Sequence, residues 1–219
     1  SNTIYDELLL VHEMGTGKTC SVIAAIEQIK NDPNSTIDGA YIFAKGTNLL
    51  NNFVKELRDK CTAGQYIPAE FKTEQEKNIR TRKLYEDFYS IHIGSGKTTF
   101  QRFSTFIKNS SDKLLINNFS NKILVIDEVH NLRYKETVKR KEKKRKIGEK
   151  NKSPPIDMYE QFKRFLHLVK NCKILLLSGT PMKDLPEEIA SVMNLILPLD
   201  NQLPDGDEFV KKYLISKGD

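Results

Sequence analysis

The chain carries a glycine-rich turn that ends in Lys18 and Thr19, and a pair of adjacent carboxylates at Asp127 and Glu128. A lysine after such a turn reaches the outer phosphates of a nucleotide, and the following hydroxyl can bind Mg²⁺. Of two carboxylates beside that site, one can hold the metal and the other can orient or deprotonate the attacking water. These residue types therefore predict hydrolysis of a nucleoside triphosphate.

The glycine-rich turn is expected to lie between a strand and a helix. Residues 8–11 form an apolar run typical of a strand buried on both faces, and residues 22–29 repeat apolar side chains at helical spacing. Glycine allows backbone N–H groups to face a phosphate, and the helix N-terminus attracts the same anion. The strict motif has a glycine where His12 stands, so this is the shorter Gly-x-Gly-Lys-Thr form. The residues expected to bind nucleotide are Met14, Gly15, Thr16, Gly17, Lys18, Thr19 and Cys20.

A second Gly-x-Gly-Lys-Thr sequence occupies residues 94–98. Lys97 stands too close to Asp127 in the sequence to leave room for the strand and helix layers of a nucleotide-binding domain, whereas Lys18 leaves ample room. We therefore expect the first turn to bind phosphate and the second to be a flexible turn, with contact to a phosphate as the alternative for the second.

Two further strands are expected to end at the same site. Residues 123–126 are an apolar run that ends at Asp127, and residues 174–177 are another that ends at Ser178. The carboxyl ends of parallel strands share one ligand crevice, so the Ser178 and Thr180 hydroxyls should lie near the acidic pair and sense the γ-phosphate. Taken in isolation, each stretch also fits a plain surface turn.

Strands and helices alternate along the chain, which predicts an α/β fold with a mainly parallel sheet. A further strand is expected at 40–44. Helices are expected at 49–58, 73–87, 156–170, 186–197 and 208–215, with partly helical structure over 101–119.

Composition fits one largish globular domain of 219 residues, with 29% charged and 38% hydrophobic residues. No apolar run has the length of a membrane span, and no signal peptide opens the chain. The three cysteines (Cys20, Cys61 and Cys172) are odd in number and far apart. They fit a reducing, cytoplasmic compartment better than a disulfide framework, and no Cys/His cluster has the spacing of a zinc site.

Positive charge is concentrated in one segment. Residues 135–152 carry ten Lys or Arg and three Glu, whereas the whole chain has a net charge of only +6. With Pro154 and Pro155 at its far edge, the segment at about 135–155 is expected to be a mobile insertion. It is either an auxiliary nucleic-acid contact, a targeting signal or a solvated loop.

The motifs together resemble superfamily 2 helicases and translocases, specifically the first of their two RecA-like domains. Residues 13–19 resemble motif I, 127–130 motif II of the DExH type and 178–182 motif III. Residues 43–57 are similar to motif Ia of chromatin-remodelling ATPases and viral relatives, and 104–106 to motif Ib. The nearest likeness is to the nucleoside triphosphatase I and early-transcription-factor helicases of poxvirus-like and giant DNA viruses. Residues 11–20, 127–131 and 175–198 carry it.

The resemblance implies a three-layer RecA-like domain that uses ATP and Mg²⁺ to act on nucleic acid. Lys18, Asp127 and Glu128 would be catalytic, and Thr19 and Asp127 would hold the metal. The residues that would couple nucleotide state to nucleic acid are His130, Ser178 and Thr180. Those that would contact backbone phosphates are Lys45, Gly46, Thr47 and Thr105, in a sequence-independent and salt-sensitive manner. A solvated loop lysine is the alternative for Lys45.

Two departures from the family suggest a fragment. The chain shows no adenine-reading Gln motif and no second RecA-like domain, so residues 1–219 are expected to hydrolyse ATP weakly on their own. The second domain is the expected partner, and the transcription machinery is a further candidate. A regulatory nucleotide-binding module with little turnover is the alternative, although the intact Lys18, Asp127 and Glu128 argue against it. A small-molecule kinase is a further alternative, but it would leave the acidic pair and the Ser-Gly-Thr turn unexplained.

Overall fold

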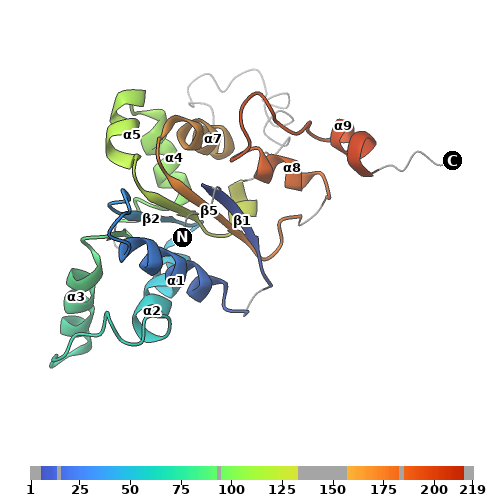
Figure 1. Cartoon of the computed structure of the whole chain (residues 1–219). Helices are drawn as coiled ribbons and strands as arrows, with labels where there is room; N and C mark the ends of the chain where they lie inside the picture. The colour runs from blue at the N-terminus through green and yellow to red at the C-terminus, as the bar shows by residue number, and fades with distance from the viewer. Residues whose placement is uncertain (1–5, 14–15, 93–94, 133–156, 183–184, 215–219) are drawn as a thin grey trace, which may run out of the picture.

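The computed structural model describes residues 6–13, 16–92, 95–132, 157–182 and 185–214. Five parallel strands form one sheet, with helices on both faces (Figure 1). The strands are β1 (Glu7–Val11), β2 (Ala40–Phe43), β3 (Tyr89–Ser90), β4 (Ile123–Ile126) and β5 (Lys173–Ser178). Their order across the sheet is β1-β5-β4-β2-β3. The predicted three-layer α/β class with a parallel sheet is confirmed.

The strand register brings the segments that carry the motifs together at the carboxyl ends of the strands. Val11 pairs with Ser178, and Ile126 pairs with both Leu176 and Phe43. Because all pairings are parallel, the loops that follow β1, β5, β4 and β2 leave the sheet in the same direction. Ligands of open parallel sheets bind at these carboxyl ends.

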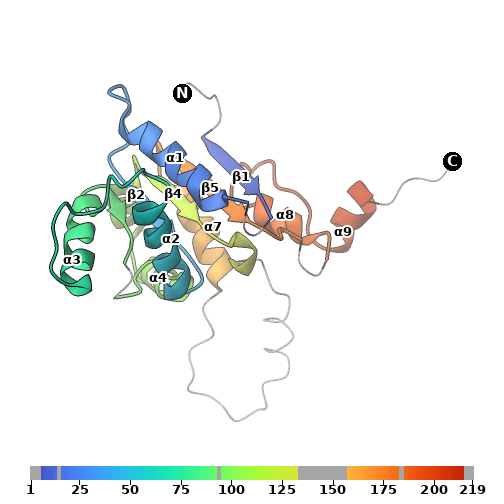
Figure 2. The ribbon, with the colours of Figure 1, turned by 90° about the horizontal axis from the view of Figure 1, so that it is seen from below.

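The helices divide between the two faces of the sheet. The first face carries α1 (Lys18–Lys30) and α2 (Thr47–Asp59), with α3 (Glu74–Tyr85) beyond them, as the view from below shows (Figure 2). The other face carries α4 (Phe100–Lys108), α5 (Asp112–Phe119), α7 (Met158–Leu168) and α8 (Glu188–Met193). A buried apolar cluster lies on each side of the sheet.

Local sequence explains where several helices begin. The side chains of Thr73, Ser111 and Asp157 accept hydrogen bonds from the first-turn N–H groups of α3, α5 and α7. The α2 helix is strongly amphipathic and buries Leu50 and Phe53 against the sheet. These features fix where α3, α5 and α7 begin and how α2 lies on the sheet.

Phenylalanine rings fill the core on the α4–α7 face. Phe162 is fully buried, and its ring centroid lies 5.8 Å from Phe43, 5.5 Å from Phe100 and 5.6 Å from Phe103. Edge-to-face and tilted arrangements dominate, as the charge distribution of aromatic rings favours. The core therefore fixes β2, and with it the loop at Lys45, against the helices of this face.

Three of the predicted strands and helices differ from the structure. The first strand is not buried on both faces, since Leu8 is 52% and Val11 49% exposed. The reason is that β1 lies at the edge of this sheet, with β5 as its neighbour. The helix expected at 186–197 is shorter, because Asn194 to Ile196 form turns. The last predicted helix is α9 (Asp207–Phe209), which continues as a π-helix at Val210–Leu214.

Within the described ranges, no helix is long and apolar enough to cross a bilayer.

Candidate functional site

The phosphate-binding turn leads directly into α1. Gly17 is the N-cap residue with a φ of +84°, a left-handed conformation that glycine adopts without steric cost. Thr16 donates its hydroxyl hydrogen to the Glu13 carbonyl at 2.8 Å, which closes the turn. Lys18, Thr19 and Cys20 form the first helical turn, so the positive end of the α1 dipole faces the loop. Met14 and Gly15, also expected to bind nucleotide, lie outside the described residues.

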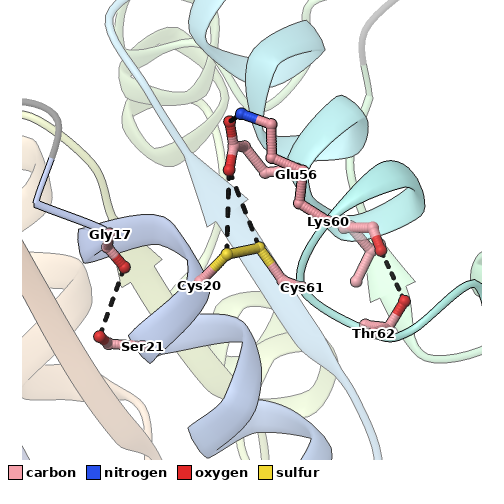
Figure 3. The surroundings of a disulfide bond; sticks show 8 residues. Gly17, Cys20, Ser21, Glu56, Lys60, Cys61 and Thr62 are labelled. Atoms are coloured by element: carbon pink, nitrogen blue, oxygen red, sulfur yellow. Dashed lines mark hydrogen bonds and ion pairs between the residues drawn. A yellow bond between two sulfur atoms is a disulfide. The ribbon is translucent and has the colours of Figure 1, made fainter.

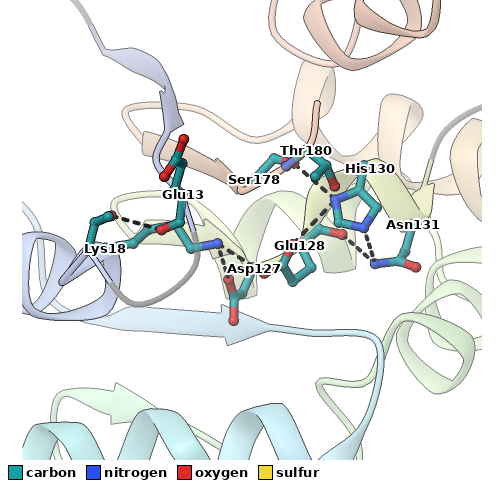
Figure 4. A network of polar contacts seen from close by, with 9 residues as sticks. Glu13, Lys18, Asp127, Glu128, His130, Asn131, Ser178 and Thr180 are labelled. Atoms are coloured by element: carbon teal, nitrogen blue, oxygen red, sulfur yellow. Dashed lines mark hydrogen bonds and ion pairs between the residues drawn. The ribbon is translucent and has the colours of Figure 1, made fainter. Parts of the chain in front are cut away.

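Lys18 lies against both predicted catalytic carboxylates (Figure 4). Its Nζ is 3.0 Å from Oε1 of Glu128 and 3.8 Å from Oδ1 of Asp127. The sequence separates Lys18 from Glu128 by 110 residues, and the parallel register of β1, β5 and β4 joins them. The three charged side chains are at most 20% exposed, so their mutual attraction is only weakly screened.

Asp127 has the environment of a cation ligand. Its N–H donates to the Phe43 carbonyl at 2.8 Å, which fixes the residue at the end of β4. Its buried Oδ1 accepts no hydrogen bond from the described residues. Burial raises the pKa of Asp127, the Lys18 charge acts in the opposite direction, and the Glu128 charge adds to the rise. An oxygen donor in this state fits a hard divalent cation, and the Thr19 hydroxyl in the next position after Lys18 has the same donor chemistry.

Glu128 is held in an unusual backbone conformation. Its φ is +54°, which is rare for a residue with a long side chain and concentrates at functional sites. Asn131 stabilises this turn, because its Nδ2 donates to the Glu128 carbonyl at 3.0 Å. Sequence reasoning gave Asn131 no role. Its place directly after the Asp-Glu-Val-His stretch is the signal that could have identified it.

The predicted coupling residues form a connected chain of contacts. Nδ1 of His130 lies 2.9 Å from Oγ of Ser178 and 3.3 Å from Oε2 of Glu128. The Asn131 amide lies 3.1 Å from Nε2 of the same ring, so the neutral imidazole would carry its proton on Nδ1. The Thr180 N–H donates to Ser178 Oγ at 3.1 Å. The contacts therefore run from the acidic turn to the loop after β5 (Figure 4).

Three of the four residues predicted to contact nucleic acid lie together at the end of β2. Lys45 and Thr47 are exposed, and Gly46 is the N-cap residue of α2. The fourth, Thr105, lies within α4 and donates its hydroxyl hydrogen to the Gln101 carbonyl at 2.9 Å. The segment beside the Lys45 loop is instead residues 98–100, because Ala44 pairs with Thr99.

The second glycine turn does not reach the acidic pair. Lys97 lines a pocket with residues of α2 and α3, and its charge acts on His92, whereas Lys18 occupies the place beside Asp127 and Glu128. Gly94, the first residue of this turn, and the basic segment 135–152 lie outside the described residues.

The three cysteines are expected to fit a reducing compartment better than a disulfide framework, but the structure joins two of them. Cys20 and Cys61 are joined by a disulfide, with Cα atoms 5.0 Å apart (Figure 3). The Glu56 carboxylate lies 3.9 and 3.8 Å from the two sulfur atoms and pairs with Lys60. The packing of α1 against α2 creates this proximity, which the 41-residue separation conceals in the sequence. Cysteine spacing therefore gives no argument about the cellular compartment.

Cys20 thus has a structural role beside the phosphate loop. Its side chain is committed to Cys61. The sulfur atoms and the Glu56 carboxylate oxygen lie within 4.8 Å of one another, although the sequence showed no spacing typical of a metal site.

Comparisons with known proteins agree with this geometry. A sequence profile of the family described as "Type III restriction enzyme, res subunit" matches residues 4–183. Helicase 087L of Invertebrate iridescent virus 3 is 36% identical over 222 residues, which cover 94% of this chain and 20% of that protein. Helicase 009L of Frog virus 3 (isolate Goorha) is 33% identical over 209 residues, with the same two shares.

A third relative comes from another group of large DNA viruses. ATP-dependent RNA helicase R563 of Acanthamoeba polyphaga mimivirus is 28% identical over 224 residues, which cover 97% of this chain and 33% of that protein. The chain spans about a fifth of the length of the two iridovirid relatives. The profile match covers well over half of the chain. Within the matched residues, Lys18 lies against Asp127 and Glu128 in one site. The chain therefore belongs to the res-subunit family and has the RecA-like P-loop domain of superfamily 2 helicases.

Proposed function

We propose that the intact protein hydrolyses ATP when it binds nucleic acid, and that this domain supplies the catalytic lysine and carboxylates. The observation that carries the proposal is the contact of Lys18 with both Asp127 and Glu128. Such an arrangement serves positioning and charge stabilisation, which are the main contributions of a protein to phosphoryl transfer. A second RecA-like domain would complete the site, as it does in the family that the motifs resemble.

Nucleotide binding changes the partner of Lys18. In this structure its ammonium group pairs with Glu128 at 3.0 Å. When the outer phosphates of ATP enter the loop, their negative charge competes for the ammonium group, and the Glu128 carboxylate is released from this pair. Glu128 is then available to orient or deprotonate the attacking water. The ion pair thus keeps the base occupied until substrate is present.

Asp127 and Thr19 are the residues proposed to hold Mg²⁺. Magnesium, when bound, neutralises charge that develops on the β- and γ-phosphates. The buried Oδ1 of Asp127, which accepts no hydrogen bond from the described residues, supports this assignment. Burial of Asp127 also favours a cation beside it, because an ionised carboxylate is costly in a desolvated site.

Coupling to nucleic acid is proposed to pass through His130, Ser178 and Thr180. These residues connect the acidic turn to the loop after β5. Lys45, Gly46 and Thr47 lie at the end of β2, the strand next to β4, and would contact backbone phosphates. A role in viral transcription is a narrower proposal, supported by the motif likeness alone.

The test is the ATPase rate of the intact protein with and without DNA or RNA. We expect nucleic acid to raise the rate, and Glu128→Gln to lower the stimulated rate by roughly 10²–10⁴-fold, the usual contribution of a general base. Lys18→Ala should also weaken ATP binding. Glu160→Gln removes a carboxylate from an exposed position on α7 and serves as the matched control, with an unchanged rate.

A protein that binds ATP but shows the same slow turnover with every nucleic acid would refute the proposal. It would support the regulatory-module alternative instead. Retention of the full stimulated rate in Glu128→Gln would refute the role given to that carboxylate.

A further inference from the structure

A basic pocket lies at the opposite end of the sheet from the P-loop. It has a volume of about 740 Å³ and lies between α2, α3 and the second glycine turn, beyond β3. Four of its lining residues are Lys55, Arg58, Arg82 and Lys97, and no carboxylate is among the residues that line it. Such a concentration of cations in a concave surface attracts an anion.

Two of the four cations form no close ion pair with a described carboxylate. Neither Lys55 nor Lys97 has a carboxylate within 4 Å in the described part of the chain, and both side chains are exposed. Arg58 pairs with Asp59, and Arg82 pairs with Glu86 at 2.9 Å. Both carboxylates lie outside the pocket lining. The pocket therefore keeps a net positive charge from its two lysines.

The pKa of a neighbouring histidine reflects the same positive charges. Burial lowers the pKa of His92, and the positive charges of Lys97 and Arg82 lower it further. His92 also lines the pocket. A site that disfavours an additional positive charge favours a negative one.

A buried hydroxyl in the pocket lacks a hydrogen-bond partner. Thr81 lines the pocket, is only 2% exposed, and its Oγ1 has no hydrogen bond to any described residue. A buried polar group left unpaired is unfavourable, and native structures seldom retain one without a ligand, water or other function to satisfy it. The hydroxyl can donate to a phosphate oxygen. It is therefore a second indication of a ligand, separate from the positive charge of the pocket.

We propose that this pocket binds a backbone phosphate of the nucleic acid, as a contact separate from Lys45, Gly46 and Thr47. The proposal rests on the proposed nucleic-acid-dependent activity. It also gives the second glycine turn a function, since that turn contributes Ser95 and Lys97 to the pocket. Both glycine-lysine turns of the chain would then bind phosphate, one from ATP and the other from nucleic acid.

The α2 helix makes the proposal geometrically reasonable. Thr47 is the first residue of α2, and Lys55 follows eight positions later on the same helix. At about 1.5 Å per residue these two positions are about 12 Å apart along the axis. A nucleic-acid strand rises about 3.4 Å per nucleotide, so three to four nucleotides cover this distance. One strand can therefore contact the N-terminus of α2 and the pocket together.

Salt dependence of nucleic-acid binding by the intact protein tests the proposal. The double variant Lys55→Gln/Lys97→Gln should bind a DNA oligonucleotide roughly tenfold more weakly. Its slope of log affinity against log salt should be shallower by about 0.7 on single strands and about 0.9 on duplex, as expected for one lost phosphate contact. The control Lys83→Gln/Lys113→Gln removes two lysines from exposed positions on α3 and α5 and should leave the slope unchanged.

Thr81→Val provides a second, uncharged test. Valine has nearly the shape of threonine, and the removed hydroxyl is buried without a partner, so the free protein should unfold at the same or a higher denaturant concentration. Affinity for the oligonucleotide should fall by roughly five- to tenfold with an unchanged salt slope, because no charge is removed.

The outcomes separate this inference from the proposed function. If nucleic acid stimulates the ATPase but the lysine double variant keeps the wild-type slope, the pocket proposal is wrong and the function stands. Binding of inorganic phosphate that requires Lys55 and Lys97, with no effect of the variants on nucleic-acid binding, would assign the pocket to a small phosphorylated ligand and also overturn the proposal. If nucleic acid neither binds nor stimulates the wild-type protein, the proposed function itself fails.

Discussion

Reduction of the Cys20–Cys61 disulfide should lower the free energy of unfolding by about 4 kcal/mol. The bond closes a loop across a sequence separation of 41 residues. A cross-link of this span removes chain entropy from the unfolded state worth about 4 kcal/mol at 25 °C. For a domain of this size, about 2–4 °C of melting temperature corresponds to each kcal/mol, so the melting temperature should fall by roughly 8–16 °C.

The assay is urea unfolding of oxidised and reduced protein in the presence of a chelator. The chelator matters because free Cys20 and Cys61 thiols, with Glu56, would offer metal ligands within 4.8 Å of one another. Thiol titration of the unfolded protein reports the redox state, with three thiols when reduced and only Cys172 when oxidised. Cys61→Ser is the matched variant. It should unfold like the reduced protein, and reductant should not change its midpoint.

One result would refute this reasoning. If thiol titration shows full reduction and the urea midpoint does not move, the unfolded chain is already constrained, or the two helices hold the loop closed without the bond.

Two further predictions concern the acidic turn and the core. The pKa of Asp127 is raised in the folded state, so its contribution to stability is present below pH ~4 and is lost as the pH rises through the folded-state pKa. Asp127→Asn should therefore unfold at higher urea than wild type at pH 7, and the difference should shrink toward pH ~4; a constant difference across this range would contradict the cause given. Phe162→Ala removes a fully buried ring and should cost about 3–5 kcal/mol by the same assay, while Leu114→Ala, at a position 41% exposed, should cost far less.

The central part of the site could be predicted because each of its residues follows a recognisable element. Lys18 opens a helix after a glycine turn, and Asp127 and Ser178 stand at or directly after the ends of apolar strands. Because the strands pair in parallel, their carboxyl ends lie on the same side of the sheet, which brings these residues together. Spacing along the sequence was enough to choose Lys18 over Lys97.

The missed features depend on which helices and strands are neighbours in space. The disulfide requires α1 to pack on α2, and the pocket requires α3 to lie beside α2, neither of which follows from hydrophobic periodicity. The exposure of Leu8 and Val11 follows from the edge position of β1, and a four-residue apolar run is the same in an edge strand as in a central one. The left-handed backbone of Glu128 has no local signal, because the residue type does not favour it.

The strand order β1-β5-β4-β2-β3 divides the sheet into a side that carries the nucleotide site and a side proposed to bind nucleic acid. The loops after β1, β5 and β4 carry the groups proposed to bind and hydrolyse ATP, whereas those after β2 and β3 carry the groups proposed to bind nucleic acid. The two sides meet at the junction of β4 and β2, where the Asp127 N–H donates to the Phe43 carbonyl two residues before Lys45. The Asp127 turn and the Lys45 loop therefore follow strands only about 4.8 Å apart, so this junction offers a short second route beside the one proposed through His130, Ser178 and Thr180.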